Sequence, residues 1–285
     1  MSAVPGEQSR AGVIGLGMIG GGVAVSLARS GQAPAVYDIR PEAADGLAGV
    51  PEPLGSPAEV ARASDVVLIA VVDADQARQV LSGKDGVLAG AHPDLVVVLL
   101  STVAVPVVHE LAESCAKDGV ELLDCGVTPG DKAFENGMVA ILGGDESAVA
   151  KAMPVLSGFA KQVVHCGPLG AGMAAKIARN VITYGTWRAV HEAAALAEAA
   201  GVAPNKLITV VEEADPQGAT LFSWLRMRLA GEASRALAGQ VKRLQDKDLA
   251  AAQDLAGRVH VTLPLVEVAR ACGAETLAIT AGENA

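Results

Sequence analysis

The 285-residue chain contains few aromatic residues and no long apolar run. Aromatic residues make up 2% of the sequence and apolar residues 51%, so any core must be aliphatic. The longest apolar stretches, residues 66–72 and 95–100, are far shorter than the roughly 20 residues that cross a bilayer. We therefore expect a helix-rich α/β protein that has no transmembrane segment and no membrane partner.

Cysteine and histidine are too scattered to indicate a disulfide framework or a metal centre. The four cysteines form no CxxC pair, and the five histidines show no HExxH spacing. We expect reduced thiols and no metal site. The first ten residues also lack the basic start and apolar segment of a secretory signal, which predicts a cytoplasmic protein.

Basic residues are in the minority. The 22 lysines and arginines are outnumbered by 32 acidic residues, and the formal net charge is −10. Binding to nucleic acid depends on clustered positive charge that displaces counterions from phosphates. This composition argues against a nucleic-acid partner and favours a small-molecule substrate.

The first half of the chain alternates strand-like and helix-like patterns. Apolar strand patterns occur in AGVIG, APAVYD, SDVVLIAV, DLVVVLLST and VELLDCGV, which begin at residues 11, 33, 64, 94 and 120. Helical patterns separate them, which is typical of a parallel sheet with crossover helices. We predict a doubly wound, Rossmann-like α/β domain over residues 1–166.

The second half has no strand signal. Residues 170–201 are good helix formers ended by Gly201, and further helices are predicted from Pro204 and over 219–230, 240–258 and 263–272. We predict an all-α domain over residues 167–285, joined to the first by a long interdomain helix, with the active site in the cleft between the domains. Its richness in alanine and leucine favours a homodimer.

A glycine motif follows the first predicted strand and opens the first predicted helix. Gly15-Leu16-Gly17-Met18-Ile19-Gly20 has the GxGxxG spacing that lets a pyrophosphate approach the backbone at a helix N-terminus. Asp38 ends the second strand, where a carboxylate binds the adenosine ribose hydroxyls of NAD. Arg40 could instead neutralise a 2′-phosphate, so NADP stays open behind NAD, and the glycine motif alone is also compatible with FAD.

Four further segments carry a family resemblance. They are Ser101-Thr102-Val103, the run DCGVTPG from Asp124 to Gly130, GPLGAG from Gly167 followed by Lys176 and Asn180, and Lys247-Asp248-Leu249. In this order, the segments make the chain similar to the β-hydroxyacid dehydrogenases, which include 3-hydroxyisobutyrate dehydrogenase. The resemblance covers nearly the whole chain, and the third segment is its most specific part.

The resemblance implies an NAD(P)-dependent oxidoreductase that transfers a hydride between a nicotinamide cofactor and a small 3-hydroxy acid or related carbonyl compound. Lys176 is then the general acid/base, and Asn180, four residues later on the same helix face, orients the substrate oxygen or the lysine. The implied substrate-binding residues are Ser101, Thr128, Pro129 and Gly130. We add Tyr184, which lies eight residues after Lys176 on the same helical face. The implied cofactor-binding residues are Gly15, Leu16, Gly17, Met18, Ile19, Gly20, Asp38, Arg40, Val71, Val72, Thr102 and Lys247.

The DCGVTPG segment departs from the family pattern DAPVSGG. Gly126 replaces a proline, and Pro129 removes a backbone N–H that could otherwise donate to an anion. The substrate is therefore not necessarily an ordinary short 3-hydroxy acid.

Two other functions remain open at this point. An imine reductase shares the architecture but typically carries Asp or Tyr in place of the catalytic lysine, so Lys176 argues against it. A dinucleotide-binding sensor without turnover is the non-enzymatic alternative. The 6-phosphogluconate dehydrogenases share the plan, but their helical domain is longer than this chain can provide.

Overall fold

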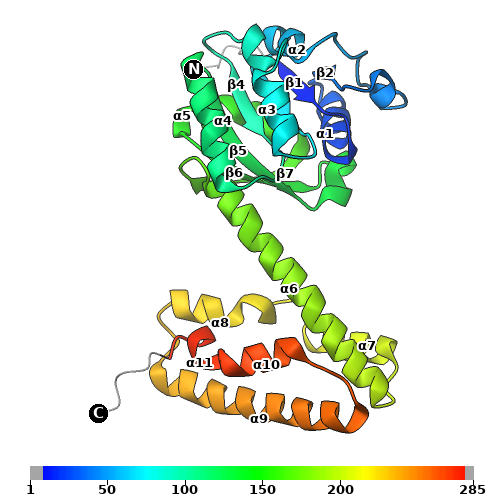
Figure 1. Ribbon diagram of the computed structural model, residues 1–285, viewed down its shortest axis with the longest axis vertical. Coiled ribbons are helices and arrows are strands. Elements are labelled where there is room, and N and C mark those ends of the chain that lie inside the picture. Colours follow the sequence, from blue (N-terminus) through cyan, green and yellow to red (C-terminus); the bar gives the residue numbers. More distant parts are fainter. Residues whose placement is uncertain (1–8, 280–285) are drawn as a thin grey trace, which may run out of the picture. The chain divides into compact units, whose positions relative to one another are not determined.

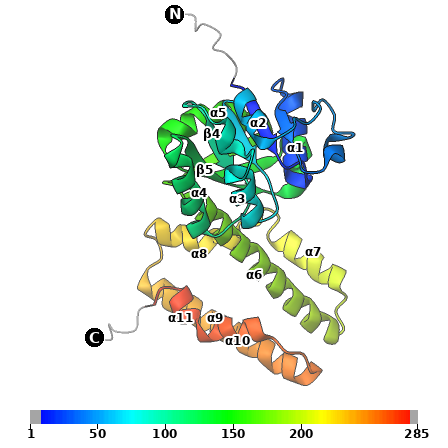
Figure 2. The same ribbon diagram turned by 45° about the horizontal axis from the view of Figure 1, so that its top comes forward.

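A single mixed sheet organises the first part of the protein. The computed structural model describes residues 9–279, and the chain divides after Asn180 into two compact units. The strands of the first unit run in the order β2-β1-β3-β4-β5-β6-β7 (Figures 1 and 2). All neighbouring strands are parallel except β5 and β6, which are antiparallel. The strands are β1 (Ala11–Ile14), β2 (Ala35–Tyr37), β3 (Val66–Ile69), β4 (Val96–Leu99), β5 (Glu121–Thr128), β6 (Met138–Gly143) and β7 (Ala160–Gly167).

Helices cover both faces of this sheet, as expected when strands are joined by right-handed crossovers. On one face α1 and α5 bury the even-numbered residues of β3 and β4, and on the other α2, α3 and α4 bury the odd-numbered ones. Both cores are built from valine, leucine, isoleucine and alanine. The helices are α1 (Met18–Arg29), α2 (Pro57–Ala63), α3 (Ala74–Ser82), α4 (Val105–Lys117) and α5 (Glu146–Phe159), with short 3₁₀ segments η1 (Pro41–Ala44), η2 (Val87–Gly90) and η3 (Gly130–Glu135).

The predicted doubly wound sheet is confirmed, and each of the five strand patterns contains one of the strands β1 to β5. Strands β6 and β7 were not predicted. Strand β7 lies at the edge of the sheet and leaves most of its residues exposed or half-buried, so its sequence lacks the apolar run of a central strand.

The second unit is entirely helical within the described residues. Helix α6 (Ala171–Ala199) begins in the first unit and ends in the second, in agreement with the predicted long helix. None of the helices within residues 9–279 is long and apolar enough to cross a membrane. The remaining helices are α7 (Pro204–Ala214), α8 (Thr220–Leu229), α9 (Arg235–Val259), α10 (Pro264–Ala271) and α11 (Gly273–Thr276).

A buried carboxylate joins two helices of the second unit. Glu192 of α6 is 3% exposed and accepts hydrogen bonds from the Leu265 N–H at 3.0 Å and the Arg188 Nε at 2.7 Å. Burial alone would raise the pKa of Glu192, but the N–H donors at the start of α10 and the Arg188 guanidinium outweigh it, so the pKa is lowered. The ionised side chain thus caps the N-terminus of α10.

Replacing Glu192 by Gln should lower the free energy of unfolding of the second unit by about 1–3 kcal/mol, because buried N–H donors lose a charged acceptor. Trp187 and Trp224 both lie in this unit, so tryptophan fluorescence during urea unfolding reports on it. Since the folded pKa of Glu192 is depressed, its stabilisation is present above the ordinary Glu pKa and is lost as the pH falls through the lowered value.

The exposed Glu198→Gln on the same helix is the matched control for loss of one carboxylate. Equal midpoints for the two variants at neutral pH would contradict a capping role for Glu192.

Candidate active site

The loop between β1 and α1 is shaped by its glycines. Gly15 has a φ of +87°, and a Cβ on Gly20 would overlap the Gly15 carbonyl oxygen, so the turn and the helix contact require glycine at both positions. Around Gly17, by contrast, no protein atom beyond its two chain neighbours lies within 4 Å of where a Cβ would stand. Helix α1 begins at Met18 and has no side-chain cap. Its free N–H groups and the open space at Gly17 fit a pyrophosphate.

A cavity of about 630 Å³ lies beside this loop, at the carboxyl ends of β1, β2 and β3. This is the topological switch point of the sheet, where β1 lies between β2 and β3. Gly15, Gly17, Asp38, Arg40 and Val72 are among the residues that line it. The cavity therefore fits the adenosine half of a dinucleotide.

Asp38 is held in this cavity wall by hydrogen bonds from Leu16 and Arg40. Its carboxylate accepts the Leu16 N–H at 2.7 Å, the Arg40 N–H at 2.9 Å and the Arg40 Nε at 3.1 Å, and its side chain is 7% exposed. Burial acts to raise the pKa of Asp38, but the hydrogen bonds from Arg40 and Leu16 lower it overall. The carboxylate is thus ionised and fixed in position at neutral pH.

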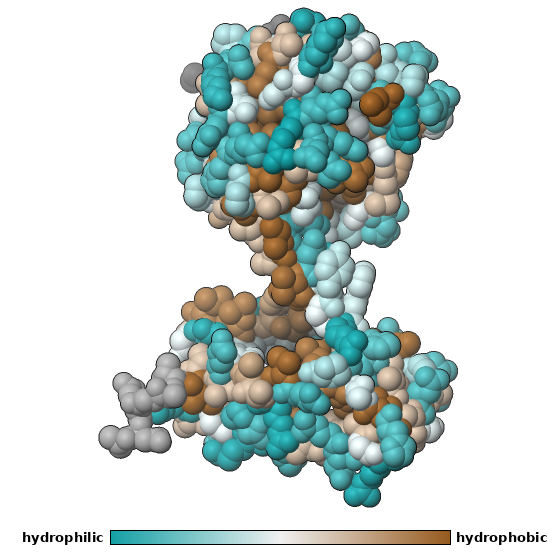
Figure 3. All heavy atoms as spheres, in the orientation of Figure 1, coloured by the Kyte–Doolittle hydropathy of each residue, from teal (hydrophilic) through white to brown (hydrophobic). Residues whose placement is uncertain are grey.

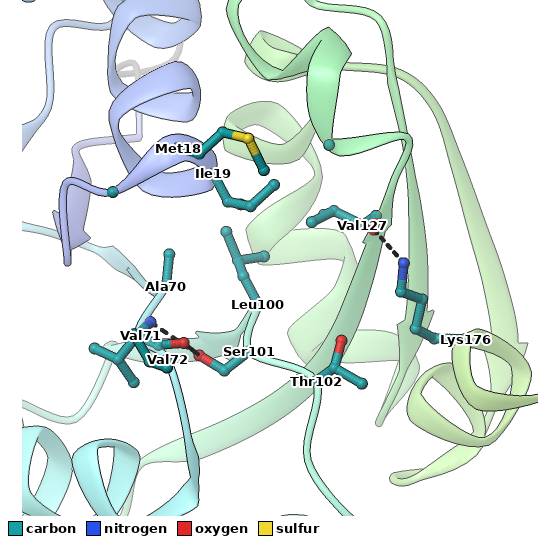
Figure 4. A pocket seen from close by; sticks show the side chains of 12 residues that line it. Met18, Ile19, Ala70, Val71, Val72, Leu100, Ser101, Thr102, Val127 and Lys176 are labelled. Atoms are coloured by element: carbon teal, nitrogen blue, oxygen red, sulfur yellow. Dashed lines mark hydrogen bonds between the residues drawn. The ribbon is translucent and has the colours of Figure 1, made fainter. Parts of the chain in front are cut away.

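A second cavity, of about 400 Å³, continues from the first (Figure 4). Gly17, Ala70, Val71 and Val72 line both cavities, so the two share a wall. The second cavity is mostly apolar, and its polar side chains come from the loop after β4 and from α6. Its lining consists of Gly17, Met18, Ile19, Ala70, Val71, Val72, Leu100, Ser101, Thr102, Val127, Gly130 and Lys176.

Ser101 is used to tie two loops together. Its hydroxyl accepts the Val71 N–H at 2.9 Å and donates to the Val71 carbonyl oxygen at 2.7 Å, which joins the loops after β3 and β4 (Figure 4). The side chain is buried, whereas Thr102 beside it is exposed on the cavity wall. Both residues predicted from the Ser-Thr-Val segment therefore line the second cavity.

The start of α6 is locked onto β5 by a buried carboxylate. Asp124 is fully buried and accepts the Gly170 N–H at 2.6 Å and the Met173 N–H at 2.5 Å. A carboxylate at this place satisfies helix N-terminal donors and complements the helix dipole. A Cβ on Gly172 would lie 2.6 Å from the Ile141 carbonyl oxygen, so glycine also allows α6 to approach β6 closely.

Lys176 reaches the second cavity from this docked helix. Its side chain is 8% exposed, and Nζ donates to the Val127 carbonyl oxygen at 2.7 Å (Figure 4). Burial lowers the pKa of Lys176, and the positive charge of nearby Arg179 lowers it further. The neutral amine, which can accept a proton, is therefore easier to populate than in a solvated lysine.

The other predicted substrate residues lie in the first unit or at its end. Thr128 is the last residue of β5, Pro129 precedes η3, and Gly130 lines the second cavity next to Ile19. The Asn180 side-chain oxygen accepts a hydrogen bond from Arg179 at 3.4 Å.

Two predicted residues belong to the second unit. Tyr184 is 59% exposed and packs edge-on against Trp187, and Lys247 pairs with Asp248 at 3.2 Å. Their roles at the site stay predictions.

The sequence analysis missed eleven of the residues that line the two cavities, among them Ala70, Leu100 and Lys84. Ala70 directly follows β3, and Leu100 directly follows β4. Lys84 follows α3 and lies in the wall of the first cavity. The position at a strand end was a usable signal for the first two, because ligands of such sheets bind there. Lys84 offered no local signal.

Two protein-family models match the chain in succession. The NAD binding domain of 6-phosphogluconate dehydrogenase matches residues 10–167, and the NAD-binding part of NADP-dependent 3-hydroxyisobutyrate dehydrogenase matches residues 170–284. The chain is also 30% identical over 263 residues to the 3-hydroxyisobutyrate dehydrogenase of Pseudomonas aeruginosa, covering 90% of this chain and 88% of that protein.

Solved structures share the fold over nearly the full chain. The crystal structure of an oxidoreductase from Mycobacterium avium aligns with a TM-score of 0.84 at 29% identity, covering 96% of this chain and 100% of that one. An imine reductase from a Pseudomonas species aligns with a TM-score of 0.75 at 18% identity, covering 96% of each chain. At that identity the likeness concerns the fold alone.

Proposed function

The chain belongs to the β-hydroxyacid dehydrogenase family of NAD(P)-dependent oxidoreductases, and from this premise we propose that it transfers a hydride between NAD and a small 3-hydroxy acid or related carbonyl compound. The observation that carries the proposal is the buried Lys176 on the wall of a cavity that adjoins the dinucleotide loop. The name of the Pseudomonas aeruginosa relative supports the hydroxy-acid class of substrate. The cytoplasm stays the predicted place of action.

Lys176 moves the proton in this mechanism. A bound nicotinamide supplies the hydride acceptor or donor. In the oxidative direction the neutral Lys176 amine accepts the proton of the substrate hydroxyl, and in the reductive direction its ammonium returns it. The Val127 carbonyl oxygen holds Nζ at the cavity wall, and we assign Asn180 to orienting the substrate oxygen. Met18, Ile19 and Leu100 make the wall around the reacting atoms apolar.

Replacing Lys176 by Ala should reduce turnover on the order of 10²–10⁴-fold and leave the dinucleotide Kd nearly unchanged, because only proton transfer is lost. The assay follows reduced nicotinamide by absorbance with a panel of 3-hydroxy acids, simple alcohols and cyclic imines. In the wild type, the oxidation rate should rise with pH through an apparent pKa below that of an ordinary lysine, since burial lowers the pKa of Lys176.

The exposed Lys161→Ala serves as the control for removal of one lysine. Undiminished turnover in Lys176→Ala would remove the lysine from the mechanism. Turnover with cyclic imines alone would assign the chain to the imine reductases, and tight dinucleotide binding without any turnover would favour a sensor.

Asp38 supports NAD as the preferred cofactor. Its buried, ionised carboxylate is placed to accept hydrogen bonds from ribose hydroxyls and to repel a 2′-phosphate. Arg40 donates to this carboxylate and is therefore partly neutralised by it.

Replacing Asp38 by Ala should raise the NAD Kd on the order of 10- to 100-fold, since hydrogen bonds to a charged group contribute about 1.5–3 kcal/mol. The NADP Kd should change less, so the ratio of the NADP Kd to the NAD Kd should fall. Calorimetric titration of both cofactors measures this, with the exposed Glu52→Ala as the charge-matched control. A wild type that binds NADP more tightly than NAD would show that Arg40 dominates.

We also propose that the second unit pairs with a second copy of the chain. The apolar side chains it buries within the described residues are few: Ala238, Ala256, Leu263 and Leu277. Between residues 181 and 190, helix α6 exposes five large apolar or aromatic side chains, and apolar (brown) atoms lie on the part of α6 that Figure 3 shows. At about 100° per residue these positions lie on several sides of the helix, with polar residues such as Arg188 between them. Large apolar side chains exposed together in this way normally mark a surface that a partner covers. The five exposed side chains are Val181, Ile182, Tyr184, Trp187 and Val190.

The wild type should therefore elute in size-exclusion chromatography with light scattering at about twice the chain mass of 28.7 kDa. Trp187→Lys should shift the protein toward the monomer, because it places a charge in the covered apolar surface, whereas Gln162→Lys at an exposed polar position of the first unit should not. A wild type that is monomeric over the micromolar range would contradict the proposed pairing.

A further inference from the structure

The close contact between β5 and α6 extends from Asp124 to Gly126. Alternate residues of a strand point to the same face, so Asp124 and Gly126 both face α6. Residues three apart on a helix lie near one another, and Gly170, Met173 and Lys176 follow that spacing. Asp124 accepts the Gly170 and Met173 N–H groups, and two residues further along β5 the helix places Lys176 directly over Gly126.

Gly126 leaves no room for a side chain at this point. A Cβ at position 126 would lie 2.6 Å from the Cγ of Lys176 and 3.1 Å from its Cδ, and would be closer still to its Cβ. Separations under 3.0 Å do not occur between real carbon atoms of this kind. With the backbone where it lies in this chain, any side chain at position 126, the proline of the family pattern included, would displace Lys176 or the start of α6 from the positions they have here. Gly126 is itself buried and pairs with Ile141 of β6, so β5 cannot easily move away.

We propose that Gly126 is a positioning residue for Lys176: its missing side chain forms the slot in which the aliphatic part of the lysine lies against β5. The slot directs Nζ along the strand to the Val127 carbonyl oxygen, at 2.7 Å, and onto the cavity wall. It also buries the lysine, which is the main cause of its lowered pKa. This inference rests on the proposed function, in which Lys176 transfers the proton.

Gly126→Ala should reduce kcat about 10- to 100-fold, because a displacement of about 1 Å at a reacting group can cost that much. The dinucleotide Kd should stay within about twofold, since position 126 lies outside the linings of both cavities. The apparent pKa of the oxidative pH profile should rise toward that of an ordinary lysine as the amine becomes solvated. Gly257→Ala is the control, because nothing beyond its chain neighbours and the backbone of its own helix lies within 4 Å of its Cβ position.

Chemical rescue tests the slot directly. Lys176→Gly removes the whole side chain and should regain turnover on addition of n-butylamine, which matches the lost atoms. In Gly126→Ala/Lys176→Gly the new methyl occupies the emptied slot, so the same amine should rescue poorly. This double variant lacks the lysine atoms that the methyl would meet, and it therefore keeps the test available if Gly126→Ala alone does not fold.

The outcomes separate the two claims. If Lys176→Gly loses turnover but folded Gly126→Ala keeps the wild-type kcat and pH profile, or if butylamine rescues both Lys176→Gly backgrounds equally, the slot is overturned and the catalytic lysine stands. If Lys176→Gly keeps wild-type turnover, both claims are overturned. Loss of thermal stability in Gly126→Ala with unchanged kinetics would reduce Gly126 to a packing role and would also overturn the proposal.

Discussion

The site depends on how the start of helix α6 is held against strand β5. The buried Asp124 carboxylate binds two N–H groups of the first turn of α6, and close backbone approach at Gly172 allows the helix to contact β6 as well. This contact fixes the position of the residues in the first turns of α6. Lys176, one turn further, is consequently buried, bound to the Val127 carbonyl oxygen and positioned at a cavity.

The contact between α6 and β5 also determines what the residues of the DCGVTPG segment do. Its residues alternate between the two faces of β5. Asp124 and Gly126 face α6, whereas Cys125 and Val127 belong to the aliphatic core on the other face. The segment therefore anchors a helix, admits a lysine and supplies that lysine with an acceptor, while the loop after it contributes Gly130 to the cavity wall. Burial in such a place lowers the pKa of the lysine, because it disfavours the charged form.

Much of the fold could be predicted from local patterns. The strands β1, β3 and β4 are short, fully buried apolar runs, and the glycine motif after β1 signals its turn and helix. Strand β7 could not be predicted in this way because it is a largely exposed edge strand. The spacing of Lys176 and Asn180 indicated a common helix face, but the burial of Lys176 depends on a strand some 50 residues earlier in the chain. Likewise, the bond between Ser101 and Val71 joins two separate loops, which no local pattern encodes.

The most direct test of the central claim is transfer of a labelled hydride. A 3-hydroxy acid deuterated at the hydroxyl-bearing carbon is incubated with the protein and NAD, and the reduced cofactor is analysed by mass spectrometry. The account predicts that the wild type forms reduced nicotinamide carrying one deuterium and that a variant without the lysine at position 176 does not. Reduced cofactor without the label, or label transfer that does not require the lysine, would contradict it.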